Sequence, residues 1–115
     1  MKIDQFEDIL AWQKAKIMTL RIYSSMKDLK DYGFKDQLCR ASVSVMNNIA
    51  EGFERRSDNE FKHFLYIAKG SCGEVRSMLY LAFELKYLKE EEYSFLLNSS
   101  KEISKIISGL IKTLN

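Results

Sequence analysis

Proline is absent from the 115-residue sequence, and glycine occurs only five times. Strands and hairpins rely on proline and glycine turns, so this scarcity favours long helices with few connections. No apolar run approaches the ~20 residues that a bilayer span requires. The N-terminal segment Met1–Asp4 also lacks the apolar stretch of a signal peptide. We therefore expect a helical protein without a membrane segment.

Cysteine is also scarce. Cys39 and Cys72 are the only two, and both lie within apolar helical patterns. Two isolated thiols do not form a disulfide framework, and they fit a reducing compartment. We expect a cytoplasmic protein in which both cysteines are buried and structural.

Charge is nearly balanced, with 18 basic and 16 acidic residues and a net charge of +2. This balance does not suggest a protein that coats DNA. The chain length favours one domain, residues 1–115, which can bury roughly two-thirds of its unfolded surface. Such a domain needs neither a disulfide nor a metal ion to fold.

Apolar residues recur at alternating spacings of three and four in four segments, the pattern of amphipathic helices. The expected helices span about residues 6–29, about 35–54, a segment from an N-cap at Ser57 with apolar stripes to Leu88, and about 90–114. Four such helices with short connections predict an all-α fold, an antiparallel up-down-up-down four-helix bundle.

Several residues predict how the helices end and cross. Gly33 can take a left-handed conformation and end the first helix. Ser57 and Glu60 match a capping box at the start of the third. Gly70 and Gly73 lie in mid-helix, where each costs about 1 kcal/mol relative to alanine. We expect them to mark a close crossing of another helix.

The third and fourth helices carry more apolar surface than one buried stripe requires. We expect self-association, so that the second stripe packs against another subunit. A deeply packed helix in a monomer would explain the same pattern. Tyr66, Tyr80 and Tyr87 share one helical face, which is more often an interface or a core edge than a base-stacking surface.

Residues for catalysis or metal binding are few. Glu60 and His63 have the Glu-x-x-His spacing of di-iron bundles, but that site needs two such motifs and the chain has one histidine. Nucleophilic catalysis needs a base near a thiol, and both cysteines are predicted in the core. The Gly70–Gly73 segment does not follow a strand, so it is no phosphate loop. We predict no catalytic residue, no metal and no cofactor.

Basic residues gather around the start of the third helix. The candidate nucleic-acid-binding residues are Arg40, Arg55, Arg56, Lys62 and Lys69, with Lys35 and His63 nearby. Arginine before a helix N-terminus suits a phosphate contact. Alternatively, this is a solvated surface with local salt bridges to Glu51, Glu54 and Asp58. Aromatic residues are not interleaved with the basic ones as a stacking platform would need.

The segment Asn48-Ile49-Ala50-Glu51-Gly52, followed by Arg55-x-Ser57-x-x-Glu60-Phe61, is the most specific part of a family resemblance. The chain resembles the four-helix bundle proteins also called 23S rRNA intervening-sequence proteins. Residues 34–69 carry most of the likeness, and Phe6–Ala15 is similar to the family's opening. The resemblance marks as motif residues Asn48, Glu51, Gly52, Ser57, Glu60 and Phe61.

The resemblance implies a homo-oligomer, a ring-shaped homopentamer, with no established enzymatic activity. Many members are encoded within insertions in bacterial large-subunit rRNA genes. A related branch binds a reverse transcriptase and nucleic acid as an accessory protein. The chain departs from the family at Met46, where proline is usual, and at Glu54, where glycine is usual. We therefore expect weak binding of RNA or DNA, with a protein-interaction scaffold as the alternative.

Overall fold

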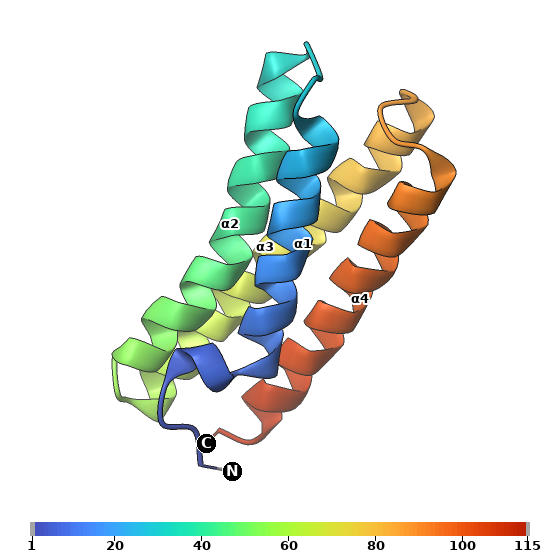
Figure 1. Ribbon diagram of the computed structural model, residues 1–115. Helices are drawn as coiled ribbons and strands as arrows, with labels where there is room; N and C mark the ends of the chain where they lie inside the picture. Colours follow the sequence, from blue (N-terminus) through green and yellow to red (C-terminus); the bar gives the residue numbers. More distant parts are fainter. Residues whose placement is uncertain (1, 115) are drawn as a thin grey trace.

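Four α-helices make up the computed structural model, which describes residues 2–114 (Figure 1). The elements are the 3-10 turn η1 (Phe6–Asp8), α1 (Leu10–Met26), α2 (Tyr32–Glu54), α3 (Asp58–Glu84) and α4 (Glu90–Lys112). Within the described residues there is no strand, so the predicted all-α four-helix fold is confirmed. None of these helices is long and apolar enough to cross a membrane.

Each helix packs against two neighbours. Contacts join α1 with α2 and α4, and α3 with α2 and α4. The helices α1 and α3 are therefore diagonal, and α3 lies behind α1 in Figure 1. The α1–α2 and α3–α4 connections lie at one end of the molecule, and the α2–α3 connection lies at the other (Figure 1). The whole measures 42 × 21 × 19 Å.

The core runs along the centre of the four helices. Its largest fully buried side chains include Met18, Ile22, Leu38, Ile49, Leu65, Leu79, Leu96, Ile103 and Ile107. Burying one such side chain stabilises the fold by about 1.5–3 kcal/mol. Apart from Met18, these residues belong to the apolar stripes predicted from the sequence, because helical spacing alone determines which side chains share a face.

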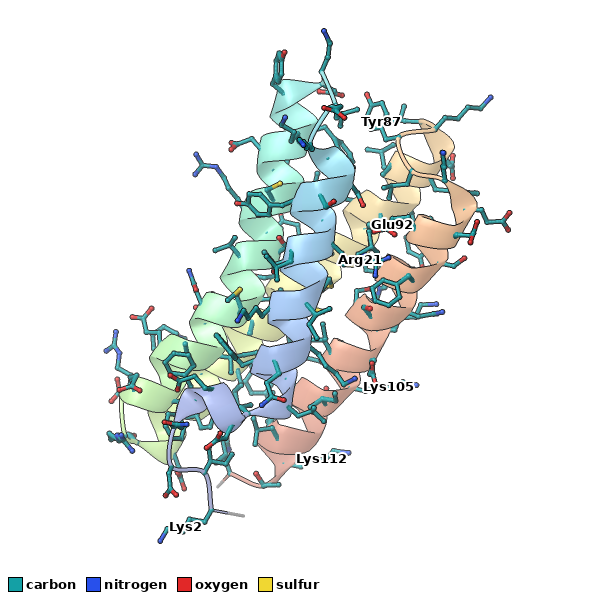
Figure 2. All side chains as sticks on the ribbon, in the orientation of Figure 1. Lys2, Arg21, Tyr87, Glu92, Lys105 and Lys112 are labelled. Carbon is teal, nitrogen blue, oxygen red and sulfur yellow. The ribbon has the colours of Figure 1, made fainter. Side chains whose placement is uncertain are left out.

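A polar link ties α1 to α4. The Arg21 Nη2 atom lies 2.6 Å from Glu92 Oε1, and the Ser25 hydroxyl donates to Glu92 Oε2 at 2.8 Å. Figure 2 shows Arg21 reaching across to Glu92. The Arg21 hydrogen bond lowers the pKa of Glu92, with the Ser25 hydrogen bond acting in the same direction. The carboxylate therefore stays charged where the two helices meet.

The first helix begins and ends differently from the prediction. Ile9 has an extended backbone, which separates η1 from α1. Gly33 lies inside α2, and no glycine in residues 2–114 has a positive φ. Asp31 is the reason, since its side chain accepts a hydrogen bond at 3.2 Å from the backbone N–H of Phe34 and caps α2. The prediction that a left-handed Gly33 ends the first helix is wrong.

The third helix also ends earlier than its apolar pattern. Leu85 and Leu88 follow Glu84, and Lys86 turns the chain with φ 64°. Tyr87 therefore leaves the face that Tyr66 and Tyr80 share, so the predicted stripe of three tyrosines is wrong at this residue. The Tyr87 hydroxyl donates to Asp31 Oδ2 at 2.6 Å instead.

The predicted close crossing at Gly70 and Gly73 is also wrong. A Cβ added to either glycine would meet no atom within 4 Å. The close approach is at Gly52, where an added Cβ would lie 2.6 Å from the Cβ of Phe64. The missing side chain of Gly52 therefore allows α3 to pack close against α2.

Candidate nucleic-acid interface

The connection between α2 and α3 is residues 55–57, and we call residues 48–64 the elbow. Arg55 caps the end of α2, and Arg56 has a left-handed backbone with φ 60°. Ser57 accepts a hydrogen bond at 3.4 Å from the backbone N–H of Glu60, as the capping box predicts. The Glu60 carboxylate turns instead to Arg55. The chain therefore reverses direction within three residues.

Aromatic side chains pack between α2 and α3 at the elbow. Phe61 is buried, and its ring meets Phe53 edge-on with centroids 5.8 Å apart. The buried Gly52 faces Phe61 and Phe64. Any side chain at this position would push α3 away from α2, because interiors are packed without spare volume.

Arg55 is engaged inside the elbow. Its Nη2 lies 2.9 Å from Glu51 Oε2, and its Nη1 lies 3.2 Å from Glu60 Oε1. The guanidinium also sits 5.0 Å from the centroid of the Phe64 ring. The hydrogen bond to Glu51 raises the pKa of Arg55. Two carboxylates thus share the cation that the sequence predicted as a phosphate contact.

Asn48 is linked to α3 through Ser44, on its own helix. Its Nδ2 donates to the Ser44 carbonyl at 2.8 Å and to the Ser44 hydroxyl at 3.0 Å. The Ser44 hydroxyl pairs with that of Ser71 on α3 at 2.8 Å. Five of the six motif residues, namely Glu51, Gly52, Ser57, Glu60 and Phe61, therefore make contacts within the elbow, and Asn48 bonds to Ser44 within α2.

Three candidate cations carry no ion pair within 4.0 Å in the described part of the chain, namely Arg56, Lys62 and Lys69. Arg56 is exposed, and its guanidinium lies 5.2 Å from the Phe53 ring. Lys62 and Lys69 are seven residues apart and share one flank of α3. Phe64, whose ring the Arg55 guanidinium contacts, projects about 200° away from Lys62 around the helix. Arg55 therefore lies on one side of α3, and Lys62 and Lys69 lie on the other.

Arg40 is far from Arg55 along α2. It pairs with Asp36 at 2.8 Å and precedes Arg55 by 15 residues of continuous helix. That separation corresponds to about 22 Å along α2. His63 does not approach a thiol; its ring packs against Phe64 with centroids 5.6 Å apart. Residues 2–114 bring together no group of three or more metal-ligand side chains.

A cleft between α1 and α2 is the feature that sequence reasoning missed. It has a volume of about 690 Å³ and is lined by Tyr23, Ser24, Lys27, Tyr32, Lys35, Asp36 and Cys39. Tyr23, Lys27, Tyr32 and Lys35 alternate along this lining, which is a different surface from the basic cluster at the start of α3. In the sequence, the only sign of this cleft is one Tyr and one Lys near the end of α1 and another Tyr and Lys near the start of α2. The reversal of the chain between α1 and α2 brings the two pairs together.

The predicted burial of both cysteines is confirmed. The Cys72 thiol donates to the Ser100 carbonyl at 3.0 Å, and burial raises the pKa of Cys72 to about 11. Burial also raises the pKa of Cys39, which lies at the wall of the α1–α2 cleft. Both thiols therefore stay protonated at neutral pH.

The sequence model of the family described as 23S rRNA-intervening sequence protein matches residues 7–109. The chain belongs to this family. A solved structure from Bacteroides thetaiotaomicron, described as a protein of unknown function from the S23 ribosomal protein family, is similar with a TM-score of 0.83. The two are 27% identical over 90% of this chain and 99% of that one. No curated protein matches the chain.

Proposed function

We propose that this family member is a non-enzymatic, cytoplasmic protein whose residues 1–115 form one antiparallel up-down-up-down bundle. The bundles assemble as a homo-oligomer, a pentameric ring as the family resemblance implies. The assembly binds RNA or DNA weakly through Arg55, Arg56, Lys62 and Lys69, with Arg40 as an outlying contact. The observation that carries the assembly is a pair of exposed apolar faces on diagonal helices.

The first apolar face lies on α1. Leu10, Ile17 and Leu20 are 51%, 53% and 61% exposed, and their spacings of seven and three residues place them on one side. Exposed aliphatic side chains that gather on one side of a helix often mark an interaction surface.

The second face lies on α3. Its exposed apolar side chains are Tyr66, Ile67, Tyr80 and Leu81, at 58%, 40%, 43% and 50% exposure. Tyr66 and Tyr80 are 14 residues apart, as are Ile67 and Leu81, so helical spacing of about 100° per residue places all four on one side of α3. The exposed Glu74 lies between Ile67 and Leu81 on this side.

The two faces point away from each other, since α1 and α3 are diagonal. A contact between the α1 face of one subunit and the α3 face of the next is heterologous. Repeating a heterologous contact closes into a ring when the rotation allows it. This geometry supports a cyclic assembly, and the number five comes from the family resemblance.

Two charge variants test the assembly. Leu20→Lys blocks the α1 face and Leu81→Lys blocks the α3 face, so each protein alone should be monomeric by light scattering. An equimolar mixture should form a 1:1 heterodimer, because each variant keeps one intact face. Ser94→Lys, on an exposed position of α4, is the control and should leave the oligomer unchanged. A monomeric parent protein, or oligomers in both single variants, would reject this interface.

Nucleic-acid binding is supported by family membership and by three cations without carboxylate partners in residues 2–114. One such cluster is weak, because the overall charge is nearly balanced. A ring repeats the cluster in each subunit, and several weak contacts then act together. Arg55 is already paired with Glu51 and Glu60, so we expect it to contribute little to the binding of nucleic acid.

A titration of structured RNA against salt tests this part. Affinity should fall as salt rises, because phosphate contacts release counterions. The double variant Arg56→Gln/Lys69→Gln should weaken binding and flatten the salt dependence. Lys105→Gln on α4, labelled in Figure 2, is the control. Absence of binding at low salt, or equal binding by the double variant, would count against the cluster.

The alternative function is a protein-interaction scaffold, with a reverse transcriptase as one partner. The exposed apolar faces of α1 and α3 favour it, since a protein partner could cover either one. Purified reverse transcriptase should then co-elute with the chain after nuclease treatment. Leu20→Lys or Leu81→Lys should abolish the complex if that face is the contact.

A further inference from the structure

The α1–α2 cleft lies at the end of the molecule opposite the elbow. Tyr23, Ser24 and Lys27 come from the last turns of α1 and its cap, and the α2 residues of the lining come from its first turns. Its volume of about 690 Å³ falls within the range of about 300–1,000 Å³ that is usual for small-ligand sites.

Two aromatic rings of the cleft are exposed. Tyr32 is 67% exposed and Tyr23 is 50% exposed. Neither ring stacks on another aromatic ring among residues 2–114. Exposed tyrosine faces of this kind stack readily on nucleic-acid bases, and every base offers such a face.

Two ammonium groups stand beside these rings. Lys35 Nζ lies 5.6 Å from the Tyr32 ring centroid and donates to the Lys27 carbonyl at 3.2 Å. Lys27 has no carboxylate within 4.0 Å in the described chain, and Asp36 is paired with Arg40, which lies outside the lining. The lining therefore contains two cations, Lys27 and Lys35, and one carboxylate that is already paired. This surplus of positive charge suits a phosphate.

We propose that the cleft binds one unpaired nucleotide of a single-stranded nucleic acid. The base stacks on Tyr32 or Tyr23, and the adjoining phosphate lies beside Lys27 and Lys35. The proposal rests on the proposed nucleic-acid binding but places a separate contact at the other end of the bundle. A duplex keeps its bases stacked on each other, so it cannot offer a base to the cleft.

Fluorescence polarisation with a labelled oligouridylate tests the proposal, with duplex RNA of the same length as comparison. Tyr32→Leu should weaken oligouridylate binding about fivefold or more, the effect of losing one stacked base. Tyr32→Phe keeps the ring and should bind like the parent protein. Lys27→Gln/Lys35→Gln should reduce the slope of log affinity against log salt by about 1.4, as expected for two lost contacts to a single strand.

A thiol footprint locates the strand. In a Cys72→Ala protein, Cys39 is the only thiol, and it lines the cleft. Saturating oligouridylate should slow alkylation of Cys39 several-fold. An unchanged alkylation rate at saturation would overturn the proposal.

The outcomes separate this proposal from the basic cluster of Arg55, Arg56, Lys62 and Lys69. Weaker binding by Tyr32→Leu with normal binding by Arg56→Gln/Lys69→Gln supports the cleft and rejects the cluster. The reverse pattern overturns the cleft alone. No oligouridylate binding at low salt overturns the cleft, and the cluster is then decided by the titration with structured RNA. If Tyr32→Leu changes the oligomer in light scattering and leaves affinity unchanged, a second subunit occupies the cleft and the proposal is overturned.

Discussion

The two ends of the bundle differ in how they use their polar and aromatic residues. At the elbow, a three-residue connection buries Phe61, caps α3 with Ser57 and surrounds Arg55 with two carboxylates. At the other end, a five-residue connection leaves Tyr32 exposed beside an open cleft, where Lys27 has no ion pair within residues 2–114. The residues most specific to the family resemblance thus build the closed end, and the open end leaves two tyrosine rings exposed beside Lys27 and Lys35.

Gly52→Ala should break the closed end with the largest effect. The new Cβ would lie 2.6 Å from the Phe64 Cβ, so α2 and α3 must separate. We expect a loss of about 1–3 kcal/mol in the free energy of unfolding, measured by urea titration. Gly33→Ala, at the open end, meets no atom within 4 Å and should stabilise by about 0.5–1 kcal/mol. Equal midpoints for the two variants would contradict the comparison.

Ser57→Ala should have the next largest effect, since it removes the acceptor for the backbone N–H of Glu60. Loss of an N-cap of this type costs about 1 kcal/mol. The midpoint of urea unfolding measures it. Ser57→Asp supplies another cap acceptor and should restore stability, so an Asp variant as unstable as the Ala variant would rule out the capping role.

The open end should respond to pH through Asp31 and Tyr87. Their hydrogen bond lowers the pKa of Asp31 and raises that of Tyr87. The Asp31 contribution is present above its ordinary pKa of 3.8 and is lost as pH falls through its lower folded value. The Tyr87 contribution is present below 10.0 and is lost as pH rises through its higher folded value.

Tyr87→Phe should therefore lower the melting temperature at neutral pH and reduce its decline at both pH extremes. Tyr80→Phe, on an exposed tyrosine of α3, is the control and should leave the pH profile unchanged. A Tyr87→Phe profile parallel to that of the parent protein would show that the hydrogen bond does not contribute.

Thiol reactivity should show the smallest difference. Cys72 lies at the centre of the bundle, 1% exposed, with its pKa raised to about 11. Cys39 is 7% exposed at the wall of the cleft. Mass spectrometry after iodoacetamide treatment should find Cys39 alkylated before Cys72. The opposite order would mean that the bundle opens more easily at its centre than at the cleft.

Sequence periodicity was sufficient to predict the helices and their core faces, but local competition moved their ends. Glycine often ends a helix. At Gly33 it does not, because Asp31 caps α2 through the backbone N–H of Phe34, and α2 begins at Tyr32. The apolar pattern continued to Leu88, yet Lys86 turns the chain after α3. Among the candidate site residues, Arg55 and Arg56 lie in the connection between α2 and α3, and Arg40 lies about 22 Å from Arg55 along α2.

The sequence by itself determined four amphipathic helices, two buried thiols and the cap at Ser57, because each depends on residues within a few turns of one helix. Only the tertiary structure decided that Gly52 meets Phe64, that α1 and α3 show outward apolar faces on diagonal helices, and that Tyr23 and Tyr32 share one cleft. These features depend on distances between segments that are brought together by packing, and spacing along the chain does not contain those distances.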